Sequence, residues 1–125
     1  MSLFDLGAIT GKRGGQKMDQ YILVVETNCK DAAREDEYNE WYDKIHLPDV
    51  LETNGVMRAV RYENTDPTDG NGKFLAVYDI ETDDIDETMK ALGENVAKKR
   101  DEGRMTDLLE RVSRGVYKRT SSLSK

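Results

Sequence analysis

The chain of 125 residues has few of the side chains that usually carry metals or crosslinks, with one cysteine and one histidine, and it has a single tryptophan. The single Cys29 excludes a disulfide within the chain, which favours a reducing compartment such as the cytoplasm. One histidine and one cysteine, with no spaced ligand cluster, give no metal-binding signature. No glycine-rich phosphate loop precedes either expected helix, so we expect no cofactor.

Long apolar runs are also missing. No segment approaches the roughly 20 apolar residues that a transmembrane helix needs. The first ten residues contain large apolar side chains, but no basic segment precedes them, so they do not predict a secretory signal. The sequence therefore predicts a soluble protein that does not enter a membrane.

Basic residues are outnumbered by acidic ones, 19 against 25, which leaves a formal net charge of −6. Such a domain repels nucleic acid and anionic lipid unless a local basic patch compensates. The short basic run at 98–100 is followed at once by Asp101 and Glu102, which is typical of a solvated helix end. We therefore expect neither nucleic acid nor a membrane surface as a partner.

Composition divides the chain into three parts. Residues 1–18 include a glycine-rich segment and are typical of a flexible arm or an added extension. Residues 19–120 have the length of one domain, and residues 121–125 are expected to be a frayed tail. Within the domain, β-branched and apolar segments predict four strands, at 21–27, 56–63, 73–81 and 112–119. Apolar residues at three- and four-residue spacing predict two helices, at 33–47 and 84–102.

Pro48 interrupts the first helical pattern. Because proline lacks an N–H and crowds the preceding turn, we expect the helix to break near Leu47. A short turn over 49–52 should follow and end at Asn54 and Gly55.

The second helix has clear end signals. Asp84, with Glu87 three positions later, is a capping-box arrangement, and Gly103 is expected to end the helix. A further short turn is expected to start near Thr106 and to carry Leu108 and Leu109.

The order strand–helix–strand–strand–helix–strand predicts an α+β domain of the ferredoxin-like βαββαβ plan, with a four-stranded antiparallel sheet. Both helices of this plan cover one face of the sheet. The first and third strands are nevertheless apolar on both faces, so the second face also needs cover. We expect that cover to be a second copy of the chain, in a homodimer with its sheets face to face. The alternative is a monomer whose N-terminal arm covers the sheet.

Two segments carry a resemblance to a known family. The helix segment 34–51 contains Trp41-Tyr42 and His46-Leu47-Pro48, and the strand segment 54–62 contains Gly55-Val56 and Arg61-Tyr62. Together they resemble the dimeric α+β barrel superfamily, and within it the EthD-like branch, over about residues 20–119. The resemblance implies a homodimer whose sheets form a barrel, with a pocket between helices and sheet in each subunit. It implies no single activity, because members include monooxygenases, polyketide cyclases, isomerases, haem-degrading enzymes and proteins without known catalysis.

His46 is the first candidate for acid–base chemistry, because histidine exchanges protons near neutral pH. A position near the helix end favours its protonated form, whereas burial favours the neutral one. The family resemblance implies a pocket position for this residue; alternatively, His46 bonds a backbone carbonyl freed by Pro48. Tyr42 lies one helical turn earlier and could relay a proton or bind substrate, or it could be a core tyrosine. Trp41 could contact substrate or belong to the core.

Further candidates lie on the expected strands, where polar side chains stand among apolar neighbours. An arginine there could bind the oxyanion or carboxylate of a small acidic or phenolic ligand. Alternatively, the charged residues pair with one another, because a buried charge needs a partner. Strand register decides which side chains face the pocket, and the sequence leaves it open. The candidates for substrate binding are Glu26, Arg58, Arg61, Tyr78 and Asp79.

These features predict a cofactor-independent enzyme that acts on a small aromatic or polyketide-like compound by cyclisation, isomerisation or oxygenation. His46 and Tyr42 would be its catalytic residues. The alternatives are a non-catalytic dimer that binds a small apolar or aromatic molecule, and a plain assembly module. A single histidine with no obvious orienting carboxylate leaves open whether the protein is an enzyme.

Overall fold

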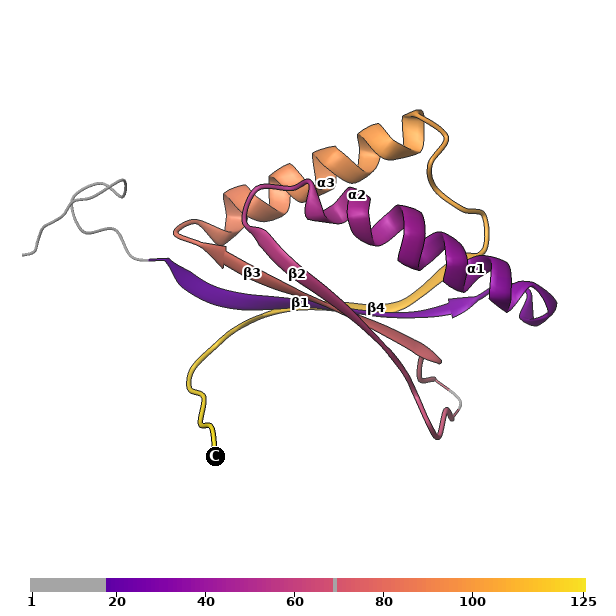
Figure 1. The fold of residues 1–125 in the computed structure, drawn as a ribbon, viewed down its shortest axis with the longest axis horizontal. Coiled ribbons are helices and arrows are strands. Elements are labelled where there is room, and N and C mark those ends of the chain that lie inside the picture. Colours follow the sequence, from indigo (N-terminus) through magenta and orange to yellow (C-terminus); the bar gives the residue numbers. More distant parts are fainter. Residues whose placement is uncertain (1–17, 69) are drawn as a thin grey trace, which may run out of the picture.

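The computed structural model describes residues 18–68 and 70–125. The predicted arm at 1–18 therefore lies outside the described residues, except for Met18. Four strands form one antiparallel sheet, in the order β2-β3-β1-β4, and all helices lie on one face of it (Figure 1). This arrangement confirms the ferredoxin-like α+β fold. The strands are β1 (Asp19–Cys29), β2 (Val56–Glu63), β3 (Phe74–Thr82) and β4 (Leu109–Lys118).

The first helical segment differs from the prediction, because the backbone does not break near Leu47. A 3₁₀ turn, η2 (Ala32–Arg34), leads into α1 (Glu35–Trp41), a π-helical turn, η3 (Tyr42–His46), and α2 (Leu47–Leu51). Leu47 keeps helical dihedral angles, and Pro48 lies in the first turn of α2. A π turn widens the helix, which gives the proline ring room beside the carbonyl group of Lys44. The segment therefore stays continuous and aligns the side chains of its three parts.

The second long helix, α3 (Ile85–Asp101), begins as the sequence predicts. The Asp84 carboxylate accepts a hydrogen bond of 3.1 Å from the backbone N–H of Glu87. Gly103 follows the helix with a φ of 77°, a left-handed conformation that glycine adopts without strain. Near Thr106 the chain makes a tight turn, in which the backbone N–H of Leu108 donates a hydrogen bond of 3.2 Å to the Thr106 hydroxyl, but Leu109 already belongs to β4.

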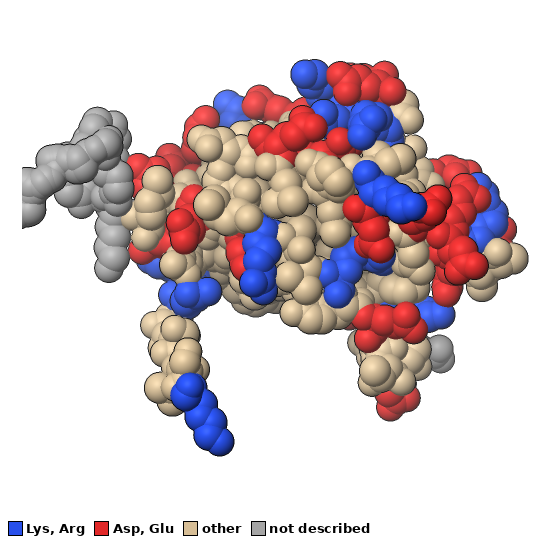
Figure 2. Space-filling view, in the orientation of Figure 1, with Lys and Arg blue, Asp and Glu red and all other residues tan. Residues whose placement is uncertain are grey.

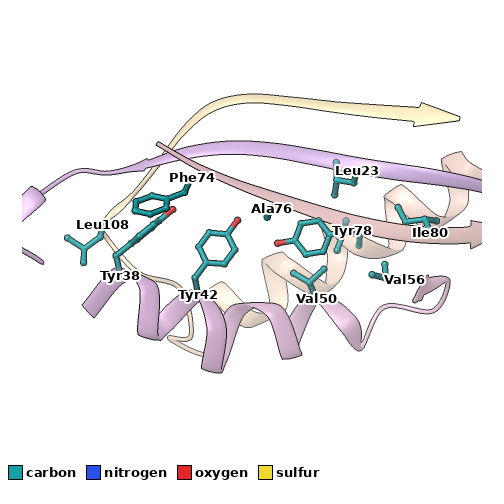
Figure 3. Packing of buried hydrophobic residues seen from close by; sticks show 11 residues of the cluster. Leu23, Tyr38, Tyr42, Val50, Val56, Phe74, Ala76, Tyr78, Ile80 and Leu108 are labelled. Carbon is teal, nitrogen blue, oxygen red and sulfur yellow. The ribbon is translucent and has the colours of Figure 1, made fainter. Parts of the chain in front are cut away.

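The core lies between the helices and the sheet. Side chains at every second position of β3 face the helices and are buried, including Phe74, Ala76 and Tyr78. Tyr38 and Tyr42, from the helix opposite, pack against them (Figure 3). Tyr38 is fully buried, and its hydroxyl group shares a hydrogen bond with Thr27 of β1. The aromatic core therefore fixes the helix that carries Tyr42 and His46 against the sheet.

The other face of the sheet is apolar too, as the sequence predicts. The strand pairing places large apolar side chains there on all four strands, and none of them is fully buried. Among the described residues, no helix packs on this face (Figure 1). The apolar side chains of this open face are Ile22, Val24, Val60, Tyr62, Leu75, Val77 and Tyr117.

Acidic and basic side chains lie next to one another over the helical layer (Figure 2). Two exposed ion pairs lie along the first helical segment: Arg34 with Glu37 at 2.7 Å and Lys44 with Glu40 at 3.1 Å. Pairs of this kind contribute little to stability, because water screens them. None of the helices in the described residues has the length and hydropathy needed to cross a membrane.

Candidate functional site

A cavity of about 390 Å³ lies between the helices and the helix-facing side of the sheet. Its volume falls within the range of roughly 300–1,000 Å³ that is typical of small-molecule sites. The inner wall consists of buried side chains, including Leu23, Val50 and Leu92. The exposed lining residues belong to α3 and β4, so the cavity opens to solvent between these two elements.

Three of the residues predicted for the site line this cavity: His46, Tyr42 and Tyr78. Tyr42, His46 and Val50 follow one another at four-residue spacing, and the continuous helix places them on one face. The structure thus brings together the two predicted catalytic side chains and one predicted substrate-binding side chain.

The His46 ring is half-buried and packed against aromatic rings. The Trp41 indole stacks on it with a centroid distance of 4.8 Å, and the Tyr42 ring meets it edge-on at 5.0 Å. Within the described part of the chain, no backbone carbonyl accepts a hydrogen bond from His46, although the sequence allowed one. Burial lowers the pKa of His46 to about 4, and the nearby Asp49 carboxylate offsets only part of this shift. At neutral pH the ring is therefore uncharged and can accept a proton.

Tyr42 and Tyr78 both line the cavity, and their hydroxyl groups point toward each other (Figure 3). Burial raises the pKa of both phenols. The hydroxyl of Tyr78 partly counteracts this shift at Tyr42, whereas Tyr42 adds to it at Tyr78. Both side chains consequently remain protonated at neutral pH and can donate hydrogen bonds to an anionic oxygen.

Arg61 lies near this cavity but does not line it. Its guanidinium group is 4.3 Å from the centroid of the Tyr42 ring, a cation–π contact. It donates hydrogen bonds of 3.0 Å to Asp43 and 2.9 Å to Asn39. Arg61 therefore holds the helix beside Tyr42 and lines a separate surface hollow.

The remaining predicted site residues do not line the cavity. Arg58 and Asp79 pair at 3.3 Å on the opposite face of the sheet, which matches the alternative of charged residues that pair with one another. Glu26 is on that face too, where it accepts a hydrogen bond of 2.8 Å from Ser113. Trp41 packs on His46 and donates a hydrogen bond of 2.9 Å to the backbone carbonyl of Arg104.

The sequence did not single out the three arginines that line the cavity. Arg100 comes from the last turn of α3, and Arg111 and Arg114 come from β4. The run at 98–100 is not simply a solvated helix end. Lys99 is mostly buried and pairs with Glu52 at 2.8 Å, and Arg100 faces the cavity. The sequence does hold one signal for these arginines: basic residues occur both at the end of the second predicted helix and in the last predicted strand.

A partly buried ion pair supports the wall near His46. Asp49 is buried, and Arg104 donates two hydrogen bonds to its carboxylate, at 2.8 and 3.0 Å. This interaction holds the pKa of Asp49 below its usual value. Asp49 therefore stays charged and is committed to Arg104, so it does not orient the imidazole. No group of metal-binding side chains occurs within the described residues.

Solved structures with a similar fold include HapK from Hahella chejuensis and a protein from Shewanella loihica PV-4 proposed to be a monooxygenase. HapK is 15% identical with a TM-score of 0.58, and the alignment covers 84% of this chain and 97% of HapK. The Shewanella protein is 12% identical with a TM-score of 0.56, and the alignment covers 84% and 98% of the two chains. An EthD family protein from Bacillus halodurans C-125 is 16% identical over 82% and 99% of the chains, with a TM-score of 0.49.

No protein-family model matches the sequence, and no curated protein matches it. At these low identities the structural similarity concerns the backbone arrangement, not the chemistry. The chain has the βαββαβ fold shared by HapK and the Shewanella protein, which is the fold that its family resemblance implies.

Proposed function

We propose that the protein is a cofactor-independent enzyme that moves a proton within a small aromatic or polyketide-like compound bound in the cavity. The observation that carries this proposal is the convergence of His46, Tyr42 and Tyr78 at the buried end of a mainly apolar cavity. A neutral base and two phenol donors at one site are the groups that enolate chemistry requires. The fold shared with a proposed monooxygenase supports a small-molecule enzyme without specifying the reaction.

His46 acts as the proton carrier in this proposal. Its neutral ring takes a proton from a carbon next to a carbonyl group, and the electron pair moves onto the carbonyl oxygen. Tyr42 or Tyr78 donates a hydrogen bond to that oxygen. Because burial lowers the pKa of His46 to about 4, the imidazolium returns its proton readily, and the substrate needs an acidic C–H bond. A carbon between two carbonyl groups, as in polyketides, meets this requirement.

The destination of the returned proton defines the reaction. Delivery to another carbon gives an isomer. In a cyclisation, the enolate carbon attacks a second carbonyl of the same molecule, and the imidazolium protonates the alkoxide that forms. Both reactions are balanced without a co-reactant, whereas oxygenation would need dioxygen after the same first step.

The proposal is tested with 1-phenylbutane-1,3-dione, whose enol and keto forms differ in ultraviolet absorbance. We expect the protein to accelerate their interconversion, and His46→Gln to lower kcat/KM by about 10²–10⁴-fold, the usual effect of losing a general base. Arg34→Gln is the control, because Arg34 is exposed, does not line the cavity and pairs with Glu37. Equal rates for wild type and His46→Gln would contradict catalysis by His46.

A non-catalytic binding or accessory protein is the second candidate function. It is favoured by one feature of the site: among the described residues, no carboxylate bonds the His46 ring to fix its orientation. Ligand binding in the cavity without any change in the interconversion rate would support this alternative.

We also propose that the protein is a homodimer in which the open faces of two sheets pack together. The support is the set of incompletely buried apolar side chains on that face, since contiguous apolar patches on a protein surface often mark an interface. Val24 and Val77 pair at the centre of this face, on the two inner strands.

Light scattering tests the dimer. The wild-type chain should give about twice the mass of the 14.2 kDa subunit, and Val24→Glu should give a single subunit. Ala97→Glu adds the same charge on an exposed position of α3 and should leave the dimer intact. A wild-type mass of one subunit at working concentration would contradict the proposal.

A further inference from the structure

The opening of the cavity is basic, although the protein as a whole is acidic. Arg100, Arg111 and Arg114 line it from two elements that approach each other across the gap between α3 and β4. All three residues are exposed, whereas the opposite end of the cavity is buried and apolar apart from His46 and the tyrosine hydroxyls. The cavity is therefore polarised, with positive charge at its entrance and apolar walls inside.

A β-bulge places two of these arginines on the same side of the sheet. Residues 111 and 114 are three positions apart, so a regular strand would direct their side chains to opposite faces. The register of β1 with β4 shifts between Glu26, which pairs with Ser113, and Thr27, which pairs with Arg111. Arg111 thus pairs with Thr27 and Arg114 with Val25, both on the helix-facing side. Bulges often redirect side chains at functional sites, and this one brings a second arginine to the cavity.

The three arginines also differ from most other arginines of the domain because they do not form ion pairs with a described carboxylate. Arg34, Arg58, Arg61 and Arg104 each lie within 4.0 Å of a carboxylate. No carboxylate of residues 18–68 or 70–125 lies that close to Arg100, Arg111 or Arg114. Among the described residues these three positive charges have no carboxylate partner, and in a chain of net charge −6 they favour the binding of an anion at the entrance.

We propose that the natural ligand is a carboxylate with an aromatic or alicyclic body, and that Arg100, Arg111 and Arg114 bind its carboxylate at the cavity entrance. This inference rests on the proposed function, because it assigns the substrate class of the same cavity. The planar guanidinium group donates paired hydrogen bonds to a carboxylate, a geometry that lysine lacks. The apolar body then extends inward past Leu23 and Leu92 toward His46.

Orientation follows from this arrangement. With the carboxylate held at the entrance, the far end of the ligand meets His46, Tyr42 and Tyr78. The arginines bind and position the ligand and take no part in proton transfer. Their loss should raise KM far more than it lowers kcat, because they contact the ligand equally well before and during the reaction.

The test compares naphthalene-2-carboxylate with naphthalene-2-carboxamide, which has the same shape and no charge. Isothermal titration calorimetry on the full chain should show at least tenfold tighter binding of the carboxylate. The variant Arg100→Gln/Arg111→Gln/Arg114→Gln should lose this preference and leave the affinity for the amide within twofold. A matched variant, Lys30→Gln/Arg34→Gln/Lys44→Gln, removes the same net charge at exposed positions outside the cavity and should keep the preference.

A second variant separates the ligand class from the location of the site. Gly93 lines the cavity, and no atom lies within 4 Å of the position that its Cβ would take. Gly93→Phe should fill the cavity without straining α3, because glycine is the weaker helix former. Binding of both naphthalene compounds should then fall by at least tenfold.

Two results would overturn the inference in different ways. Equal affinities for carboxylate and amide, or a preference that survives in the triple arginine variant, would refute the arginine site and leave the cavity as a binding site. Unchanged binding of both compounds by Gly93→Phe, or no binding of either by the wild type, would refute the cavity and the proposed function together.

Discussion

Replacing Tyr38 by alanine is expected to destabilise the fold by about 3–5 kcal/mol, the usual cost of removing a large aromatic side chain from a core. Tyr38 is fully buried, and its ring centroid lies 5.7 Å from that of Phe74 on β3. It also meets the Tyr42 ring edge-on at 5.6 Å. Alanine would leave an empty space in the core and would lack the contacts that hold the helix carrying Tyr42 and His46 against the sheet. Urea unfolding, followed by Trp41 fluorescence at one protein concentration, measures the change.

Tyr38→Phe is the matched control, because it keeps the ring and removes only the hydroxyl group. The buried Thr27 hydroxyl then loses its partner, so we expect a loss of about 1–2 kcal/mol. If Tyr38→Ala costs no more than Tyr38→Phe, ring packing does not anchor the helix. Full activity in Tyr38→Ala at low temperature would also show that Tyr42 is positioned by other contacts.

The predictable part of this site is the part encoded by local periodicity. Tyr38, Tyr42 and His46 recur every four residues, and this spacing alone places them on one helical face. The break expected near Leu47 was wrong because the rule for Pro48 assumes an ordinary α-helix, whereas a π turn precedes the proline here. A π turn depends on tertiary packing and has no clear sequence signal.

The arginines show what local patterns cannot predict. Arg58 and Arg61 are three positions apart on one strand, and register alone decides which of them faces the helices. Arg111 and Arg114 share a face only because of a bulge, which strict alternation of side chains would not predict. The sequence therefore identified which strand residues have suitable side chains, but it could not predict which of them face the cavity.

The protonation state of His46 was open in the sequence for a related reason. The helix end favours the charged ring and burial favours the neutral one, and the balance depends on packing. In the structure, Trp41 and Tyr42 surround the ring, and the helix continues past it into α2. The expected dipole contribution of a helix end is thus absent, and desolvation dominates.

The low pKa of His46 leads to a pH-dependent stability. In the unfolded chain the ring has its ordinary pKa of 6.5, and in the folded protein burial lowers it to about 4. Between these values the unfolded state binds a proton that the folded state does not, so stability falls as the pH falls. We expect the free energy of unfolding to decrease by about 2 kcal/mol between pH 7 and pH 5 through this residue alone. The contribution is fully present above pH 6.5 and is lost as the pH approaches 4.

Urea unfolding of wild type and His46→Gln at pH 7 and pH 5 isolates this effect, because glutamine does not titrate. The wild type should lose about 2 kcal/mol more than the variant over this interval. The chain has one histidine, so a single imidazole proton signal in NMR reports the folded pKa directly. A titration midpoint near 6.5, together with equal pH dependence of the two proteins, would mean that His46 is well hydrated. A hydrated imidazole would still be mostly neutral at pH 7 and would be a stronger base, so this result would refute the desolvation of His46 and leave its proton transfer possible.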